Sequence, residues 1–143
     1  MMPPVIPPLV DDHVMHALVQ AARAARERAY APYSKFAVGA ALLDDHGRLH
    51  AGCNVENAAY PQSQCAEASA IAHLVLTGAR RILAVAVVGV AAEPVTPCGG
   101  CRQRLREFAG DEVPIWIADL QIVRAHYTLG QLLPASFGPA HLA

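Results

Sequence analysis

Three cysteines and one glutamate have the spacing of a zinc site that can carry out acid–base chemistry. Cys65 stands two residues before Glu67, and Cys98 and Cys101 are three residues apart in a Pro-Cys-Gly-Gly-Cys segment further along the chain. Zn²⁺ prefers sulfur and nitrogen ligands in a tetrahedron, and a catalytic zinc site uses three protein ligands and leaves one position for water. The pattern therefore predicts zinc bound by three sulfurs, with the Glu67 carboxylate exchanging protons with the water.

Both cysteine segments are expected at the start of a helix. Residues 66–77 have apolar side chains at helical spacing directly after Cys65, and residues 99–108 do so after Cys98. Because helical side chains lean towards the N-terminal end, Cys65 and Glu67 can both approach a metal placed beyond that end. The partial positive charge of the two helix ends would offset the negative charge that three thiolates leave on zinc.

The other segments complete an α/β pattern. An amphipathic spacing predicts a helix over 11–29, and apolar runs and turn residues predict strands and a final helical turn. The expected order is α, β, β, α, β, α, β, β, which indicates an α/β sandwich around a mixed sheet. We expect a flexible N-terminal arm over residues 1–10, which hold four prolines, and a single domain over 11–143. The expected strands are 36–43, 49–55, 81–90, 113–118 and 122–128, and the helical turn is 129–133.

Composition excludes several classes of protein. Of 143 residues, 54% are hydrophobic and 16% are charged, which suits a folded domain. The longest apolar run, 82–92, is shorter than the roughly 20 residues of a membrane helix, and the N-terminal residues lack the charge pattern of a signal peptide. A formal net charge of −1 and 6% aromatic residues argue against nucleic-acid binding. We therefore expect a cytoplasmic protein with no membrane or nucleic-acid partner, whose thiols are not used in disulfides.

Six sequence blocks, in the same order, resemble those of the small zinc-dependent cytidine deaminases that assemble as homotetramers. The two cysteine blocks also match the zinc-deaminase signature of a glutamate near one ligand followed by Pro-Cys-x-x-Cys. The resemblance extends from about Tyr30 to Phe137 and implies a three-layer α/β/α sandwich with a mixed five-stranded sheet. The blocks are residues 32–36, 38–41, 52–57, 65–67, 97–103 and 132–134.

This resemblance implies a reaction and an assembly. The family hydrolyses cytidine and deoxycytidine to uridine and deoxyuridine, releases ammonia and serves pyrimidine salvage. By resemblance, one zinc ion per subunit is held by the three cysteines. Glu67 would deprotonate the water, protonate ring N3 as hydroxide adds to C4, and then protonate the departing amine. The implied partners are a small nucleoside substrate and further copies of the chain in a homotetramer.

The resemblance also assigns substrate contacts. Asn54 and Glu56 match the pair that binds the ribose 3′ hydroxyl, and Phe36 matches the ring that packs against the base. The backbone amide of Ala66 lies where the family contacts the base, and Phe137 resembles an aromatic residue supplied by a neighbouring subunit. Without the resemblance, the two phenylalanines are as consistent with core packing, and Asn54 and Glu56 with the solvated edge of a strand.

One position departs from the family pattern. Similar small deaminases often have an arginine directly after the catalytic glutamate, hydrogen-bonded to two zinc thiolates, whereas this chain has Ala68. We hypothesise that helix ends and backbone N–H groups replace that charge, with help from Arg102.

Two other functions fit parts of the pattern. A purely structural zinc site would close its fourth position with Cys53 and give an interaction module without catalysis. A deaminase could instead act on another pyrimidine-like compound, such as blasticidin S, or on bases within a nucleic acid. The Asn54-x-Glu56 pair favours a free ribose over the former, and the near-neutral charge opposes the latter.

Overall fold

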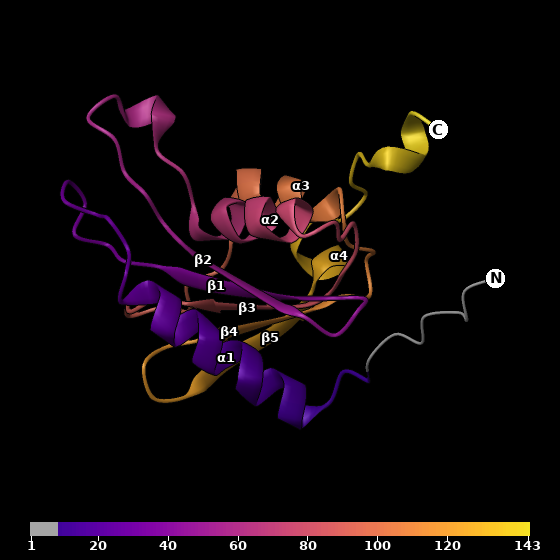
Figure 1. Ribbon diagram of the computed structural model, residues 1–143, viewed down its shortest axis with the longest axis horizontal. Helices are drawn as coiled ribbons and strands as arrows, with labels where there is room; N and C mark the ends of the chain where they lie inside the picture. The colour runs from indigo at the N-terminus through magenta and orange to yellow at the C-terminus, as the bar shows by residue number, and fades with distance from the viewer. Residues whose placement is uncertain (1–8) are drawn as a thin grey trace.

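Five strands form one mixed sheet with helices on both faces in the computed structural model, which describes residues 9–143 (Figure 1). The expected α/β fold with a mixed five-stranded sheet is confirmed. Most of the arm expected over residues 1–10 lies outside the described residues. The helices are α1 (Asp12–Arg26), α2 (Ala66–Leu76), α3 (Gly99–Arg106) and α4 (Leu129–Leu132), with 3-10 turns at Tyr60–Gln62 and Pro139–His141. The strands are β1 (Gly39–Asp44), β2 (Leu49–Cys53), β3 (Ile82–Val88), β4 (Pro114–Ala118) and β5 (Val123–Thr128).

The sheet has the strand order β2-β1-β3-β4-β5. Strand β1 is antiparallel to both β2 and β3, and β4 is antiparallel to β5. The central pair, β3 and β4, is parallel because α3 lies in the crossover between them. Parallel strands at the centre of a sheet are covered on both faces, which explains the unbroken apolar sequence of β3.

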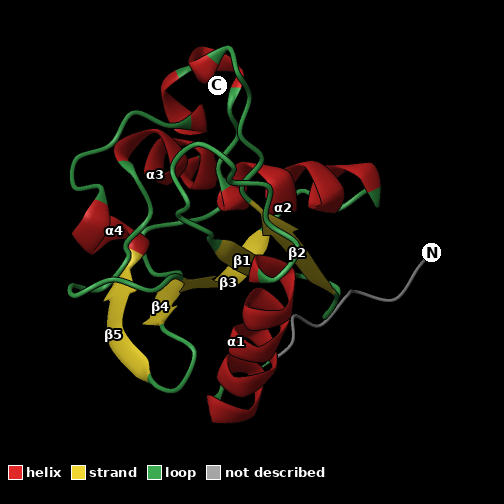
Figure 2. Cartoon of the chain, turned by 90° about the vertical axis from the view of Figure 1, so that its left-hand side faces the viewer, coloured by secondary structure: helices red, strands yellow, loops and turns green. Residues whose placement is uncertain are grey.

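The helices cover the two faces of the sheet separately, with α1 on one face and α2 and α3 on the other (Figures 1 and 2). Side chains alternate along β3, so that Val85 and Val87 pack towards α2 and α3, while Ala84 and Ala86 pack towards α1. The core is therefore divided into two apolar layers, one on each side of the sheet.

Two glycines allow helix backbone to press against the sheet. A Cβ atom on Gly52 of β2 would lie 2.4 Å from the backbone nitrogen of Ala70 in α2. A Cβ atom on Gly39 of β1 would lie 1.9 Å from the carbonyl oxygen of Ala22 in α1. Real Cβ atoms do not approach so closely, so both positions need glycine. The contact at Gly52 sets the depth at which α2 rests on the sheet.

Strand β1 starts three residues later than the apolar pattern predicts. The expected strand began at Phe36, but the ladder begins at Gly39. Before Gly39, the Asn54 side chain provides the hydrogen bonds that a neighbouring strand would provide. It accepts one from the Val38 N–H at 2.9 Å and donates one to the Phe36 carbonyl oxygen at 2.7 Å. A side-chain amide thus replaces the missing strand partner and holds the segment before β1 in place.

Candidate active site

The three predicted sulfur ligands lie together at the N-termini of α2 and α3. Cys65 is the N-cap residue of α2, and Cys98 is the N-cap residue of α3. Their Sγ atoms are 3.8 Å apart, and all three sulfurs, including that of Cys101 in the first turn of α3, lie within 4.8 Å of one another. A tetrahedron with Zn–S distances of about 2.3 Å has sulfurs about 3.8 Å apart. The cluster therefore has the dimensions of one zinc site.

The electrostatics of the cluster favour a bound cation. Burial raises the pKa of Cys65 and of Cys101, and the negative charge of Glu67 raises both further. Burial opposes ionisation of Cys98 too, but a hydrogen bond from the Cys101 backbone N–H lowers the pKa of Cys98 overall. Thiolates packed this closely need positive charge, which zinc supplies, so the donor set fits the metal. Among the described residues this ligand group does not include Cys53, so the four-sulfur arrangement is not formed.

Glu67 is the second residue of α2, and its side chain is almost completely buried beside the sulfurs. Only 4% of the residue is exposed, and it lines the same cavity as Cys65 and Cys98. Burial raises the pKa of the Glu67 carboxyl, while the positive charge of Arg104 acts in the opposite direction. In the described part of the chain this buried carboxyl forms no salt bridge, and a buried carboxyl with a shifted pKa next to a metal-ligand cluster is typical of functional sites.

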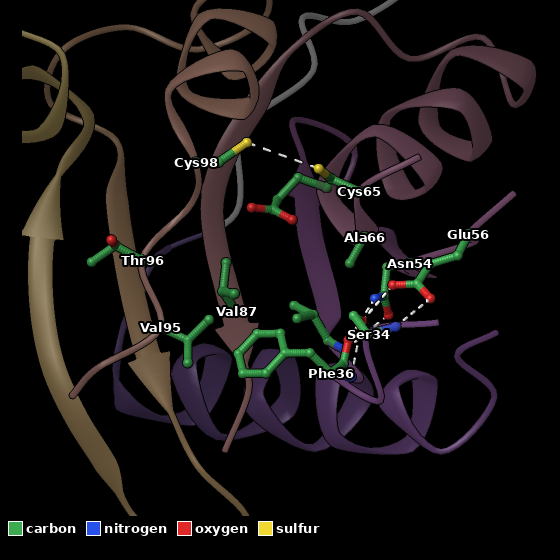
Figure 3. Close-up of a pocket in the computed structure, with 12 residues that line it drawn as sticks. Ser34, Phe36, Asn54, Glu56, Cys65, Ala66, Val87, Val95, Thr96 and Cys98 are labelled. Atoms are coloured by element: carbon green, nitrogen blue, oxygen red, sulfur yellow. Dashed lines mark hydrogen bonds between the residues drawn. The ribbon is translucent and has the colours of Figure 1, made fainter. Parts of the chain in front are cut away.

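A cavity of about 320 Å³ opens beside Cys65, Cys98 and Glu67 (Figure 3). This volume is at the lower end of the range of small-molecule sites. The predicted residues Phe36, Asn54, Glu56 and Ala66 all line it. Five further lining residues were not predicted: Ser34, Val38, Val87, Val95 and Thr96.

The polar end of the cavity is organised around Glu56. Its Oε1 accepts hydrogen bonds from the backbone N–H groups of Tyr33 at 2.9 Å and Ser34 at 3.1 Å, and its Oε2 accepts one from the Ser34 hydroxyl. These bonds from Ser34 lower the pKa of Glu56, so it is a carboxylate at neutral pH. A carboxylate accepts about four hydrogen bonds, so Oε2 retains room for a hydroxyl donor from a ligand.

The opposite part of the cavity is lined by apolar side chains. Phe36 is 40% exposed and faces Val87 and Val95 across the cavity (Figure 3). The Ala66 amide is the first of α2, and the first N–H groups of a helix have no partner within it, so this donor is available at the cavity wall. The valines carry no functional group, so only three-dimensional proximity reveals them. Ser34 lies in a block that the resemblance included, but its hydroxyl had no predicted role.

Comparisons with known proteins decide the family. The chain matches the family model described as the cytidine and deoxycytidylate deaminase zinc-binding region over residues 12–117. The chain belongs to the cytidine deaminase family. It is 43% identical to the cytidine deaminase of Sporosarcina psychrophila, over 88% of this chain and 93% of that protein. It is 48% identical to the cytidine deaminase of Mycobacterium tuberculosis, over 77% of this chain and 79% of that protein.

Solved cytidine deaminases share the fold. The crystal structure of cytidine deaminase from Burkholderia pseudomallei matches with a TM-score of 0.81 at 44% identity, covering 85% of this chain and 98% of that one. That of cytidine deaminase from Mycobacterium tuberculosis matches with a TM-score of 0.77 at 44% identity, covering 91% and 99%. The predictions of a cytidine deaminase enzyme, of its fold and of a zinc cofactor are confirmed.

Arg102 and Phe137 both lie away from the cavity of their own chain. The guanidinium of Arg102 donates to the carbonyl oxygens of Pro97 at 2.7 Å and Leu132 at 2.8 Å and so ties α4 to the start of α3, away from the thiolates. Its suggested role in charge compensation is therefore not supported. Phe137 is 57% exposed, stacks on His141 with ring centres 4.8 Å apart and does not line the cavity of its own chain.

Proposed function

We propose that this chain hydrolyses cytidine and deoxycytidine to uridine and deoxyuridine with release of ammonia. The observation that carries the proposal is the position of Glu67, buried beside three sulfurs and lining a cavity that has a carboxylate at one end. Zinc held by Cys65, Cys98 and Cys101 supplies a Lewis acid that makes water nucleophilic near neutral pH.

The remaining chemistry belongs to Glu67. Its carboxylate takes a proton from the attacking water and delivers it to ring N3 as C4 becomes tetrahedral. It then takes the remaining proton from the new C4 hydroxyl and delivers it to the amino group, which leaves as ammonia while the C4 oxygen becomes the carbonyl of the product. Each transfer requires a carboxyl within hydrogen-bond reach of both groups, and the buried location at the sulfur end of the cavity supports this. Burial also excludes bulk water, which would compete for these protons.

The rest of the cavity suits a free nucleoside. The face of Phe36 supports the base, the Ala66 N–H donates to a polar edge of it, and Asn54 and Glu56 take the ribose 3′ hydroxyl at the other end. A hydroxyl is a donor, and Glu56 is a fixed acceptor whose own partners are already in place. A 3′ phosphate would bring negative charge to this carboxylate, so the arrangement favours a free nucleoside over a nucleic acid.

The test follows turnover and zinc in the same protein preparations. We expect the native protein to deplete the absorbance of cytidine and of deoxycytidine, while Glu67→Gln retains zinc and loses activity by about 10²–10⁴-fold. Blasticidin S and a cytosine-containing single-stranded oligonucleotide complete the panel. Zinc at full occupancy with no turnover of any cytosine compound would refute the deaminase and favour a structural zinc module.

The setting of the enzyme is part of the proposal. We place residues 11–143 in one domain, the chain in a cytoplasmic homotetramer and the reaction in pyrimidine salvage, on the support of family membership and composition. The exposed ring of Phe137 is then available to the site of a neighbouring copy. Within residues 9–143, no helix combines the length and the hydrophobicity needed to span a bilayer.

A further inference from the structure

Among residues 9–143, the arginine that hydrogen-bonds to the sulfur cluster is Arg104, which had no role predicted from the sequence. The Nη1 atom of Arg104 donates to the buried Sγ of Cys101 at 4.0 Å. Arg104 follows Cys101 by three residues on α3, so the two side chains lie on the same face of the helix. A Cβ atom on Gly100 would lie 3.4 Å from the same Nη1, which places the guanidinium against the turn that holds Cys98 and Cys101.

The cluster needs such a charge. Three thiolates leave a net negative charge on a bound divalent ion, and Glu67 adds another negative charge beside it. The N-termini of α2 and α3 supply partial positive charge, but the guanidinium of Arg104 supplies a full one. The hydrogen bond from Arg104 to Cys101 therefore brings a full positive charge to the edge of the cluster.

Ala68, the position at which related deaminases often have an arginine, lies close to Arg104. Ala68 of α2 and Arg104 of α3 both line a groove of about 560 Å³ between the two helices. The small side chain of Ala68 leaves room in this groove. Residues 68 and 104 thus share one groove, and in this sequence the cation in it belongs to α3.

We propose that Arg104 is the positioning residue that compensates the charge of the zinc–thiolate cluster, in the role that residue 68 cannot fill with an alanine side chain. The guanidinium lowers the electron density on the sulfurs and so stabilises the fully ionised three-thiolate site. The inference rests on the proposed function only through the zinc site, and zinc binding is measurable without turnover.

The experiment compares zinc affinity in four variants by competition with a chromophoric chelator. Arg104→Gln removes the charge, and Arg104→Lys keeps it. Ala68→Arg combined with Arg104→Gln returns a charge from α2, and Arg81→Gln removes an exposed charge beyond the far end of α2. We expect Arg104→Gln to weaken zinc binding by about 10-fold or more, and Arg104→Lys and the double variant to recover most of the loss. Arg81→Gln should match the native protein.

A spectroscopic readout separates charge from folding. In Co²⁺-substituted protein, loss of the guanidinium raises the energy of the sulfur electrons, so the sulfur-to-metal absorption of Arg104→Gln should move to longer wavelength. Arg104 is an exposed residue, so the zinc-free variants should unfold at the native temperature. Native zinc affinity together with an unshifted absorption in Arg104→Gln would overturn the proposal. So would an equal loss of affinity in Arg81→Gln. Loss of turnover in Glu67→Gln bears on the deaminase reaction and leaves these measurements unaffected.

Discussion

The side-chain amide of Asn54 donates a 2.7 Å hydrogen bond to the carbonyl oxygen of Phe36. Its own carbonyl oxygen accepts from the Val38 N–H, so one side chain holds both ends of a three-residue segment. That segment carries the ring expected to support the base. Asn54 therefore shapes the apolar wall of the cavity, and in the proposed function it has a second task, which is to bind the ribose.

Replacement of Asn54 should affect both tasks. In Asn54→Ala, two backbone groups lose their partners, and we expect the free energy of unfolding to fall by roughly 1–3 kcal/mol. Asn54→Asp keeps the acceptor for Val38 but cannot donate to Phe36, so it should destabilise less. Urea unfolding of the zinc-loaded proteins measures the difference. A native-like stability of Asn54→Ala would show that the tether is dispensable.

Glu56 should be coupled to the ribose 3′ hydroxyl. We expect Glu56→Gln to lower kcat/KM for cytidine by about 10–100-fold, because the acceptor at Oε2 is lost or weakened. With 3′-deoxycytidine the same substitution should have little further effect, since the interacting hydroxyl is absent. The matched control is 2′-deoxycytidine, on which the variant should lose as much as on cytidine. Additive losses from the variant and from 3′-deoxycytidine would contradict the assignment.

Zinc content should distinguish Cys53 from the cysteines of the sulfur cluster. Cys53→Ser is expected to retain one zinc ion per chain, whereas Cys101→Ser should lose zinc, because Cys101 belongs to the sulfur cluster and Cys53 does not. Removal of zinc from the native protein with a chelator should abolish turnover, and added zinc should restore it. Atomic absorption after gel filtration gives the stoichiometry. Loss of zinc in Cys53→Ser would revive the four-sulfur structural site.

Stability should depend on pH through Asp44, which is completely buried at the end of β1. Burial alone would raise the pKa of Asp44, but hydrogen bonds from His50 at 2.7 Å, from Arg48 and from the His46 backbone lower it to about 2. Because this folded-state pKa lies below the ordinary value of 3.8, the stabilisation is complete above about pH 4 and is lost as pH falls towards 2.

Asp44→Asn tests this dependence. We expect the variant to be less stable than the native protein by roughly 1–3 kcal/mol at pH 7 and nearly equal to it at pH 2. Urea unfolding at both pH values measures the gap, and the exposed Glu93→Gln is the control with the same change of charge. A gap that is the same at pH 7 and pH 2 would contradict the assignment.

The elements and the metal ligands were predictable because their signals are local. Apolar spacing and the breaker Pro97 define α2 and α3, and the N-cap positions of Cys65 and Cys98 follow from where those helices begin. The start of β1 was predicted too early, because the partner of that segment is a side chain 16 residues away at Asn54. No periodicity within the segment itself carries that information.

Arg102 was suggested from the sequence as the positive charge near the cluster, but among the described residues the arginine that contacts a cluster sulfur is Arg104, and its spacing from Cys101 could have indicated this. Arg102 follows Cys101 directly and therefore points to a different side of α3, where backbone carbonyls bind it. Arg104 is three residues from Cys101, and that spacing places two side chains on one face of a helix. The cavity walls Val87 and Val95 had no comparable signal, because only the fold brings Val87 of β3 and Val95 of the loop between β3 and α3 to the site.

The two glycines of the β1–β2 hairpin act together. Gly52 faces α2 and pairs with Ala40, the direct neighbour of Gly39, which faces α1. At this point the backbones of α1 and α2 lie directly against the two faces of the sheet, with no side chain from either glycine between them. The distance between α2, which begins at the ligand Cys65, and α1 on the other face of the sheet is thus set by main-chain contacts. Because these contacts involve no side chain of the two apolar layers, substitutions in those layers leave the distance unchanged. The position of Cys65 relative to the sheet is therefore insulated from changes in the core.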